Sequence, residues 1–324
     1  MTAKDFIFMH NVEAKETEWL WYPYIPQGKI TVLLGDPGEG KSSLALSLAA
    51  AITRGEQFPE MQQIGGIRYV ICQNGEDGLS DTIKPRLERA GAECQYVAVI
   101  REDDTPLSLL DERLHEGIEM LRPKLVIIDP LQGFLGDGVD MHRANEIRPI
   151  MAKLAETAEY SNAAILLIGH LNKAFSAGKA LYRGLGSIDL VAAARSVLLL
   201  AKDPEHPENR VLMQLKNSLA ALGNTVGFTI NEDGIFTYLG DYEISEETLL
   251  TPRAEKRESM KDKAKKLIAE WMLREEPLYA RDIYLLADSE GISKEVLMRV
   301  KTEMHIRSEK TKDGWIWKTG GFKR

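Results

Sequence analysis

Cysteine and long apolar runs are both scarce in this sequence. The 324 residues include only two cysteines, Cys72 and Cys94, which are too far apart along the chain to form a CxxC pair. This excludes a disulfide framework and a thiolate zinc site, and it is typical of proteins from a reducing compartment. No window of roughly eighteen apolar residues occurs, and the first residues lack the apolar core of a signal peptide. We therefore expect a soluble, cytoplasmic protein without membrane contact.

An excess of positive charge is also absent from the chain as a whole, whose net charge is −8. The distribution is uneven, because residues 253–324 contain 18 lysines and arginines against 13 acidic residues, whereas the remainder contains 23 against 36. A basic C-terminal segment suits contact with a polyanion, although an ordinary solvated surface is the alternative. The length allows one large α/β domain with a small appendage.

The strongest motif lies between residues 28 and 54, which read as a strand, a glycine-rich turn and a helix. Glycines let backbone amides approach phosphate groups closely, and the positive end of the following helix points at the same place. Lys41 would reach the β- and γ-phosphates, and the Ser42 hydroxyl would ligate Mg²⁺. The motif therefore predicts a site for ATP and Mg²⁺ formed by Gly35, Asp36, Pro37, Gly38, Glu39, Gly40, Lys41, Ser42 and Ser43.

Three further apolar runs, 67–72, 124–128 and 164–169, read as strands with polar residues at or after their ends. The carboxyl ends of parallel strands border the ligand crevice of an α/β sheet. We expect Glu76 to orient the attacking water and Asp129 to hold the Mg²⁺ water shell opposite Ser42. Asp77 is better explained as an acid in the first turn of a helix. His170 is a candidate γ-phosphate sensor, although a single histidine is more often structural.

Repeating strand and helix signals through residue 200, followed by a hairpin over 211–230, predict a mainly parallel sheet covered by helices. We assign this α/β domain to residues 1–240. Its N-terminal aromatic cluster over 19–24 is expected to seal the sheet edge or to pack on a neighbouring subunit. A glycine-rich loop over 173–187 suits the backbone of single-stranded nucleic acid, the alternative being a disordered connector; its basic residues are Lys173, Lys179 and Arg183.

Residues 241–260 are polar with little periodicity and are predicted to be a linker. Beyond them, three helical segments and a hairpin over 306–318 predict a winged-helix domain at 261–324, whose third helix normally enters the major groove. Protein docking is the alternative use of such a domain. The candidate nucleic-acid contacts are Lys294, Arg299 and Lys301 on the third helix, and Lys310 and Lys312 on the wing.

The ordered set of motifs resembles the RecA-like ATPases of the RepA-type hexameric helicase group, which are common in plasmid and phage replication modules. The resemblance covers approximately residues 20–235, and the tail looks like the winged helix often fused to phage-encoded members. The motifs are Gly35 to Ser42, Gly75-Glu76-Asp77, Val126 to Asp129, Gly169 to Lys173, Arg183 to Ser187 and Ala193 to Ser196.

The resemblance implies roles for particular residues. It makes Glu76 the catalytic glutamate, Asp129 the Mg²⁺-linked aspartate and His170 the γ-phosphate sensor. Arg195 falls where the arginine finger lies, which reaches the nucleotide of the neighbouring subunit; an ion pair with a carboxylate is the alternative. Lys216 matches only in part, because the Lys-x-Arg pair of the related DnaB-like group ends here in a serine.

The function that follows is an Mg²⁺-ATP-hydrolysing homo-oligomer, which the family resemblance implies is a hexamer, acting as a motor on single-stranded DNA as replicative-type helicases do. A DNA-binding ATPase switch without unwinding activity, such as a recombinase or a loader, shares the same site residues. A non-catalytic scaffold is the third alternative, and the intact set of Lys41, Glu76 and Asp129 argues against it.

Overall fold

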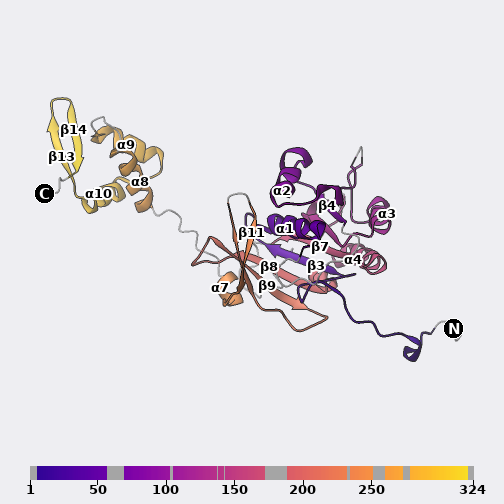
Figure 1. Cartoon of the computed structure of the whole chain (residues 1–324). Coiled ribbons are helices and arrows are strands. Elements are labelled where there is room, and N and C mark those ends of the chain that lie inside the picture. Colours follow the sequence, from indigo (N-terminus) through magenta and orange to yellow (C-terminus); the bar gives the residue numbers. More distant parts are fainter. Residues whose placement is uncertain are drawn as a thin grey trace. The chain divides into compact units, whose positions relative to one another are not determined.

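The computed structural model describes residues 6–56, 69–102, 105–136, 138–141, 143–171, 188–231, 234–250, 260–272 and 278–319. The chain divides into two compact units, 1–250 (unit 1) and 251–324 (unit 2), which Figure 1 shows by sequence colour. The division lies within the segment predicted as a linker, which also contains helix α7 (Glu246–Leu250). The basic loop predicted over 173–187, with Lys173, Lys179 and Arg183, lies outside the described residues.

A nine-stranded sheet with the order β11-β10-β9-β8-β3-β7-β6-β4-β5 forms the centre of unit 1, counted over the described residues. Its parallel strands are β3 (Ile30–Gly35), β4 (Val70–Asn74), β5 (Val97–Ala98), β6 (Leu125–Asp129), β7 (Ala164–His170) and β8 (Ser196–Lys202). The antiparallel strands are β9 (Asn209–Asn217), β10 (Val226–Ile230) and β11 (Phe236–Asp241). The predicted α/β fold is confirmed, and β11 is a strand that the sequence pattern does not predict.

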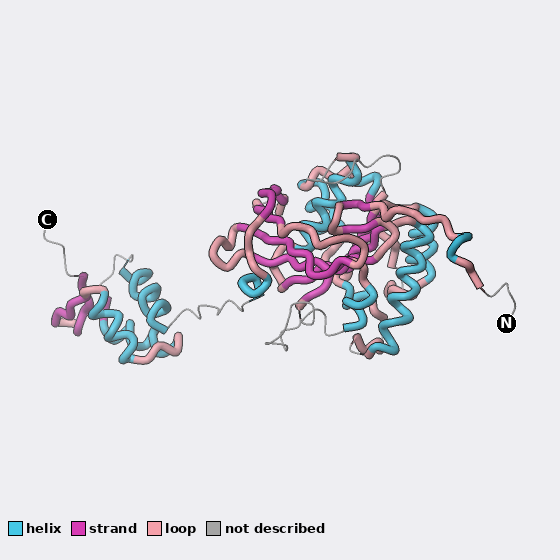
Figure 2. Tube along the Cα trace, turned by 90° about the horizontal axis from the view of Figure 1, so that it is seen from below, coloured by secondary structure: helices cyan, strands magenta, loops and turns pink. Residues whose placement is uncertain are grey.

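Helices cover both faces of this sheet, as the turned view in Figure 2 shows. Alternate residues of each strand point to opposite faces, so the long aliphatic runs of β3, β6 and β7 supply two separate cores. One face carries α1 (Lys41–Arg54) and α2 (Lys84–Arg89), the latter preceded by a π-helical turn at Leu79–Ile83. The other carries α3 (Glu112–Leu121), α4 (Ala144–Ser161) and α6 (Ile188–Ala193).

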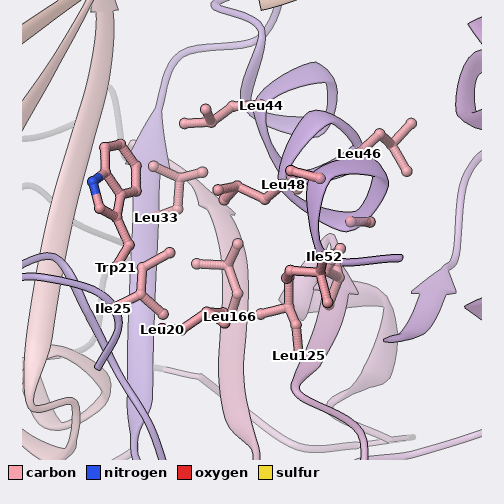
Figure 3. Packing of buried hydrophobic residues seen from close by; sticks show 14 of the residues in the cluster. Leu20, Trp21, Ile25, Leu33, Leu44, Leu46, Leu48, Ile52, Leu125 and Leu166 are labelled. Carbon is pink, nitrogen blue, oxygen red and sulfur yellow. The ribbon is translucent and has the colours of Figure 1, made fainter. Parts of the chain in front are cut away.

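The packing of α1 fixes the position of the loop that precedes it. Leu44, Leu48 and Ile52 lie on one face of α1 and contact the sheet (Figure 3). Each fully buried aliphatic side chain of this kind contributes roughly 1.5–3 kcal/mol to stability. Because the helix is held along its length, its N-terminus has a fixed direction relative to the end of β3.

The N-terminal aromatic segment packs within its own chain. It forms a small ladder of β1 (Trp19–Trp21) and β2 (Ile25–Pro26), and both Trp21 and Tyr24 are buried in the core shared with α1. Trp21 lies 6.3 Å from Phe228 of β10, measured between ring centroids, and the Tyr24 hydroxyl donates to the carbonyl of Asn224 at 2.7 Å. The segment therefore covers a face of the sheet near β10 rather than its edge.

Unit 2 contains three helices and a three-stranded antiparallel sheet among the described residues. The helices are α8 (Met260–Met272), α9 (Ala280–Ser289) and α10 (Lys294–Glu303); the sheet order is β12-β14-β13, with β12 at Leu278–Tyr279, β13 at Ile306–Thr311 and β14 at Gly314–Thr319. Ser293 caps α10 by accepting from the amide of Val296, as its position before the helix suggests. One core holds the elements together, with Ile268, Leu297 and Trp317 buried in it.

Short 3₁₀ turns occur at Met9–Asn11, Cys94–Tyr96 and Leu131–Phe134. The turn at Cys94–Tyr96 leads directly into the two residues of β5. Within the described part of the chain, no helix has the length and apolar character needed to cross a membrane.

Candidate nucleotide-binding site

The turn between β3 and α1 requires glycine at specific places. Gly38 and Gly40 have φ angles of +78° and +94°, which side chains with a Cβ rarely adopt. A Cβ on Gly40 would also lie 2.5 Å from Cδ1 of Ile230, and one on Gly35 would lie 2.3 Å from the carbonyl oxygen of Leu200. Gly35 and Gly40 therefore lie so close to β8 and β10 that a side chain there would force movement, whereas Gly38 is limited by its φ angle alone.

A carboxylate anchors this loop to the neighbouring strand. Glu39 accepts a hydrogen bond from the backbone amide of Lys202 at 2.5 Å, and its other oxygen lies 3.8 Å from the Lys202 ammonium. The side chain of Glu39 therefore faces the end of β8, which leaves only its backbone for a ligand. Because Lys202 binds the carboxylate of Glu39, this loop can contain an acidic residue and still attract anions.

Lys41 occupies the centre of the site. Its side chain is buried, and its ammonium donates to the carbonyls of Gly35 at 2.9 Å and Asp36 at 2.8 Å, with Nδ1 of His170 at 3.3 Å. Burial lowers the pKa of Lys41, and the nearby carboxylate of Asp129 opposes that shift. These acceptors are uncharged. Negatively charged phosphate oxygens at the loop would therefore bind the Lys41 ammonium more strongly and replace them.

Asp129 lies at the end of β6, where the sequence predicts it. Its carboxylate is buried and lies near enough to the Ser42 hydroxyl for that group to lower its pKa. Burial raises the pKa of Asp129, while the Ser42 hydroxyl and the charge of Lys41 act in the opposite direction. A hydroxyl and a nearby carboxylate oxygen are ligands that suit Mg²⁺, which completes its shell with water and phosphate oxygens.

No cluster of three or more His, Cys, Asp or Glu side chains suited to a metal occurs among the residues that the structure describes. The Ser42 and Asp129 pair fits an ion that is held partly by its nucleotide, as expected for Mg²⁺ in phosphate-binding loops.

The turn after β4 directs Glu76 to the same cavity. The Asn74 side chain accepts from the amides of Glu76 at 2.9 Å and Asp77 at 2.6 Å, which bends the chain directly after the strand. Glu76 is exposed at the cavity wall, and its charge influences both Lys41 and Asp129. Asp77 instead pairs with Arg86 of α2 at 2.9 Å; it precedes the N-cap Gly78, and the acid in the first turn is Asp81 rather than Asp77.

The cavity at these residues has a volume of about 560 Å³, within the range of roughly 300–1,000 Å³ that is usual for small-molecule sites. It brings together Glu76, Asp129 and His170 with the loop residues Pro37, Gly38, Gly40, Lys41, Ser42 and Ser43. The predicted residues Gly35, Asp36 and Glu39 do not line it. Sequence reasoning missed the rest of its lining, which has no motif. These residues are Leu46 and Ser47 on α1, Arg86 and Arg89 on α2 with its C-cap Ala90, and Arg210, Ile230, Gly234 and Ile235 on the β9 to β11 side.

Arg195 and Lys216 lie at the opposite end of the sheet from this cavity. Arg195 precedes β8, is exposed, and donates its backbone amide to the carbonyl of Ile30 at the start of β3. The length of β3 separates that point from the loop, roughly 3.3 Å for each residue. Lys216 donates to the carbonyls of Val191, Ala192 and Ala194 at 3.0, 2.9 and 2.8 Å. Neither residue can act on the nucleotide of its own chain.

The five basic residues of unit 2 that are predicted to contact nucleic acid fall into two groups. The ammonium of Lys301 lies 4.7 Å from the centroid of the Trp317 ring and donates to the Ser308 hydroxyl, and Lys294 lies 5.2 Å from the Tyr284 ring centroid. Burial lowers the pKa of Lys301. Arg299, Lys310 and Lys312 are exposed. The second group is therefore better placed to contact a polyanion.

The sheet is mainly parallel, and a glycine-rich loop precedes α1. Lys41, Ser42 and Asp129 meet at the cavity beside this loop. Together these features define a RecA-like P-loop ATPase. The comparison with protein families is consistent with this class. The chain belongs to the AAA domain family, whose model matches residues 3–175.

Among solved structures, the chain is similar to the ATPase domain of G40P, with a TM-score of 0.52 and 16% identity over 67% of this chain and 86% of that one. Among curated proteins, it is 26% identical over 215 residues to the DNA repair protein RadA of Halalkalibacterium halodurans, and 25% identical over 223 residues to that of Bacillus subtilis. These matches cover 65% and 68% of this chain but only 41% and 43% of the relatives.

Proposed function

We propose that this protein is an oligomeric, Mg²⁺-dependent ATPase of the cytoplasm that acts as a motor on single-stranded DNA, as RepA-like replicative helicases do. The observation that supports it best is the division of the predicted residues. Lys41, Glu76 and Asp129 meet at one cavity, whereas Arg195 lies exposed at the other end of the same sheet. That division suits a site completed by a second copy of the chain.

In the proposed reaction, Lys41 exchanges its carbonyl acceptors for oxygens of the β- and γ-phosphates. Ser42 and Asp129 would hold Mg²⁺, which would supply positive charge beside the phosphates. Glu76, exposed at the wall of the cavity, orients the attacking water and accepts its proton. His170, within 3.3 Å of the Lys41 ammonium, changes partner when the γ-phosphate leaves.

Closed rings place one face of a subunit against a different face of the next. In such a ring, Arg195 approaches the γ-phosphate of the neighbouring copy and stabilises the charge that develops there. Lys216 is less suited to this role, because three carbonyls at the end of α6 already hold its ammonium. We therefore assign the finger to Arg195 and a supporting role to Lys216.

The proposed DNA contacts lie in two places. The basic loop 173–187 follows directly on β7, whose last residue His170 contacts Lys41, so the γ-phosphate state is relayed along one strand to that loop. Unit 2 is proposed to be a winged helix, since its helices α8 to α10 and the β13–β14 hairpin occur in that order. Arg299, Lys310 and Lys312 supply its charge.

Two assays test this function together. ATP hydrolysis is measured with and without a single-stranded oligonucleotide, and strand displacement is measured on a forked duplex. We expect hydrolysis to rise with single strands, the fork to be unwound, and both activities to vanish in Lys41→Ala. Hydrolysis that is indifferent to DNA would refute the proposal.

A second function, an ATPase switch on DNA without unwinding, is favoured by the similarity to the DNA repair protein RadA. The ammonium of Lys216 is held by a carbonyl of its own chain. It is therefore less suited to act on a neighbouring subunit, which also favours the switch. Hydrolysis stimulated by single strands, with no strand displacement on the fork, would identify the switch.

A further inference from the structure

The wall of the cavity on the β9 side carries an arginine that no motif identifies. Arg210 is the second residue of β9 and pairs with Lys202 of β8 and Phe228 of β10. Because Lys202 contacts Glu39 of the loop, Arg210 lies one strand beyond the loop. Asp129 and His170 end strands β6 and β7, on the other side of β3. Arg210 therefore lies away from the hydrolytic end of the cavity.

The shape of the cavity indicates what this side meets. From the loop it continues over the first two turns of α1 to Leu46 and Ser47, between α2 and the hairpin residues Ile230 and Ile235. The loop holds phosphates, so this continuation is the place for the nucleoside. Aliphatic walls suit the faces of a base, and an arginine beside them can stack on it or donate to the ribose.

The guanidinium of Arg210 has hydrogen-bonding capacity left over. One terminal nitrogen donates to the carbonyls of Pro207 at 2.7 Å and Asn209 at 3.2 Å. Its Nε is buried and has no hydrogen-bond partner among the described residues. An arginine offers five N–H donors, and a buried donor without a partner is unfavourable until a ligand supplies an acceptor.

A compact turn fixes the direction from which Arg210 enters the cavity. The buried carboxylate of Asp203 accepts from the amides of Glu205 at 2.7 Å and His206 at 3.2 Å and from the hydroxyl of Tyr242. The Tyr242 hydroxyl also accepts from Nδ2 of Asn209 at 3.1 Å, next to Arg210. Tyr242 therefore ties the start of β9 to the turn that precedes it.

We infer that Arg210 binds the base and ribose of the nucleotide in its own chain, and that Tyr242 is the residue that positions it. The inference rests on the proposed function in one respect, since it takes the same cavity to be the ATP site. The two arginines then have separate roles, because Arg210 holds the ground state of the bound nucleotide, whereas Arg195 acts on the hydrolysis of a neighbour's nucleotide.

The first test is calorimetric titration of the full chain, in the presence of Mg²⁺, with ATP, ADP and inorganic tripolyphosphate. Arg210→Gln should weaken ATP and ADP by the same factor, about tenfold for the loss of one charge-assisted contact, and should leave tripolyphosphate unchanged. In hydrolysis assays KM should rise with little change in kcat. Arg143→Gln, an exposed arginine at the start of α4, is the matched control and should behave as wild type.

ATP affinity equal to wild type in Arg210→Gln would overturn the inference, and so would an equal loss for tripolyphosphate, which would place Arg210 at the phosphates. The titrations require no turnover and no DNA. They therefore remain decisive if the motor function fails, and a failure of Arg210 to bind leaves DNA-stimulated hydrolysis to be judged separately.

The positioning role has its own test. Tyr242→Phe should reproduce the selective weakening of ATP and ADP to a smaller extent, while retaining its fold because the ring remains. The double variant should be no weaker than Arg210→Gln alone, since both changes remove one interaction. Additive losses in the double variant would show that Tyr242 acts independently of Arg210.

Discussion

Replacing Glu39 with alanine tests how the phosphate-binding loop is held. The change removes the acceptor of the Lys202 amide and the nearby ammonium contact. Only 15% of the Glu39 side chain is exposed, so the charge-assisted hydrogen bond is worth about 1.5–3 kcal/mol. We expect the free energy of unfolding of unit 1 to fall by about that amount, and KM for ATP to rise because the loop loses its fixed position.

The measurement is urea unfolding, with the slope against denaturant checked to be unchanged. Glu56→Ala is the matched control: Glu56 pairs with Arg54 at 2.6 Å, but its side chain is 58% exposed, so the loss should be roughly 0–1 kcal/mol. Glu39→Gln should fall between the two, because an amide oxygen still accepts from the Lys202 amide. A Glu39→Ala protein as stable as the Glu56→Ala protein, with wild-type KM, would refute the anchoring argument.

Three further predictions concern the proposed contact between neighbouring copies, the buried histidine of unit 1 and the wing of unit 2. Arg195→Ala should bind ATP normally and lose hydrolysis about 10³-fold or more. Mixing it with Lys41→Ala should restore part of the activity, because each variant supplies the group that the other lacks. Wild-type turnover in Arg195→Ala alone would contradict a site shared between neighbouring copies. Burial lowers the pKa of His115, which lies between Thr157 and the Leu109 carbonyl. The unfolded chain therefore binds a proton before the folded one does, and the free energy of unfolding should fall as the pH drops below the ordinary histidine range. His115→Gln should flatten that dependence. Lys312→Ala should weaken DNA binding and lower the salt dependence by about one charge; an unchanged slope would remove the wing from the interface.

One side of the cavity is predictable from sequence alone. The loop, Glu76, Asp129 and His170 each follow a strand or precede a helix, and in a parallel sheet such positions meet at one edge regardless of loop length. The order of elements in unit 2 is equally accessible, because its helices and its hairpin carry local signals such as the Ser293 cap.

The other side of the cavity cannot be predicted in this way. Arg210 and Ile230 reach the cavity because β9 and β10 return antiparallel beside β8, and that register is set by contacts far apart in sequence. The strand β11 escapes prediction since it is buried on neither face, and its sequence lacks a strong apolar run. The face on which Trp21 packs and the carbonyls that hold Lys216 likewise depend on the tertiary fold.

The Tyr242 contact also gives the chain a mechanical property. A few residues after Tyr242, Leu249 of α7 packs on Val211 and Met213 of β9, and the polypeptide then continues into unit 2. A pull on unit 2 would therefore reach β9, the strand that carries Arg210, through α7 and Tyr242.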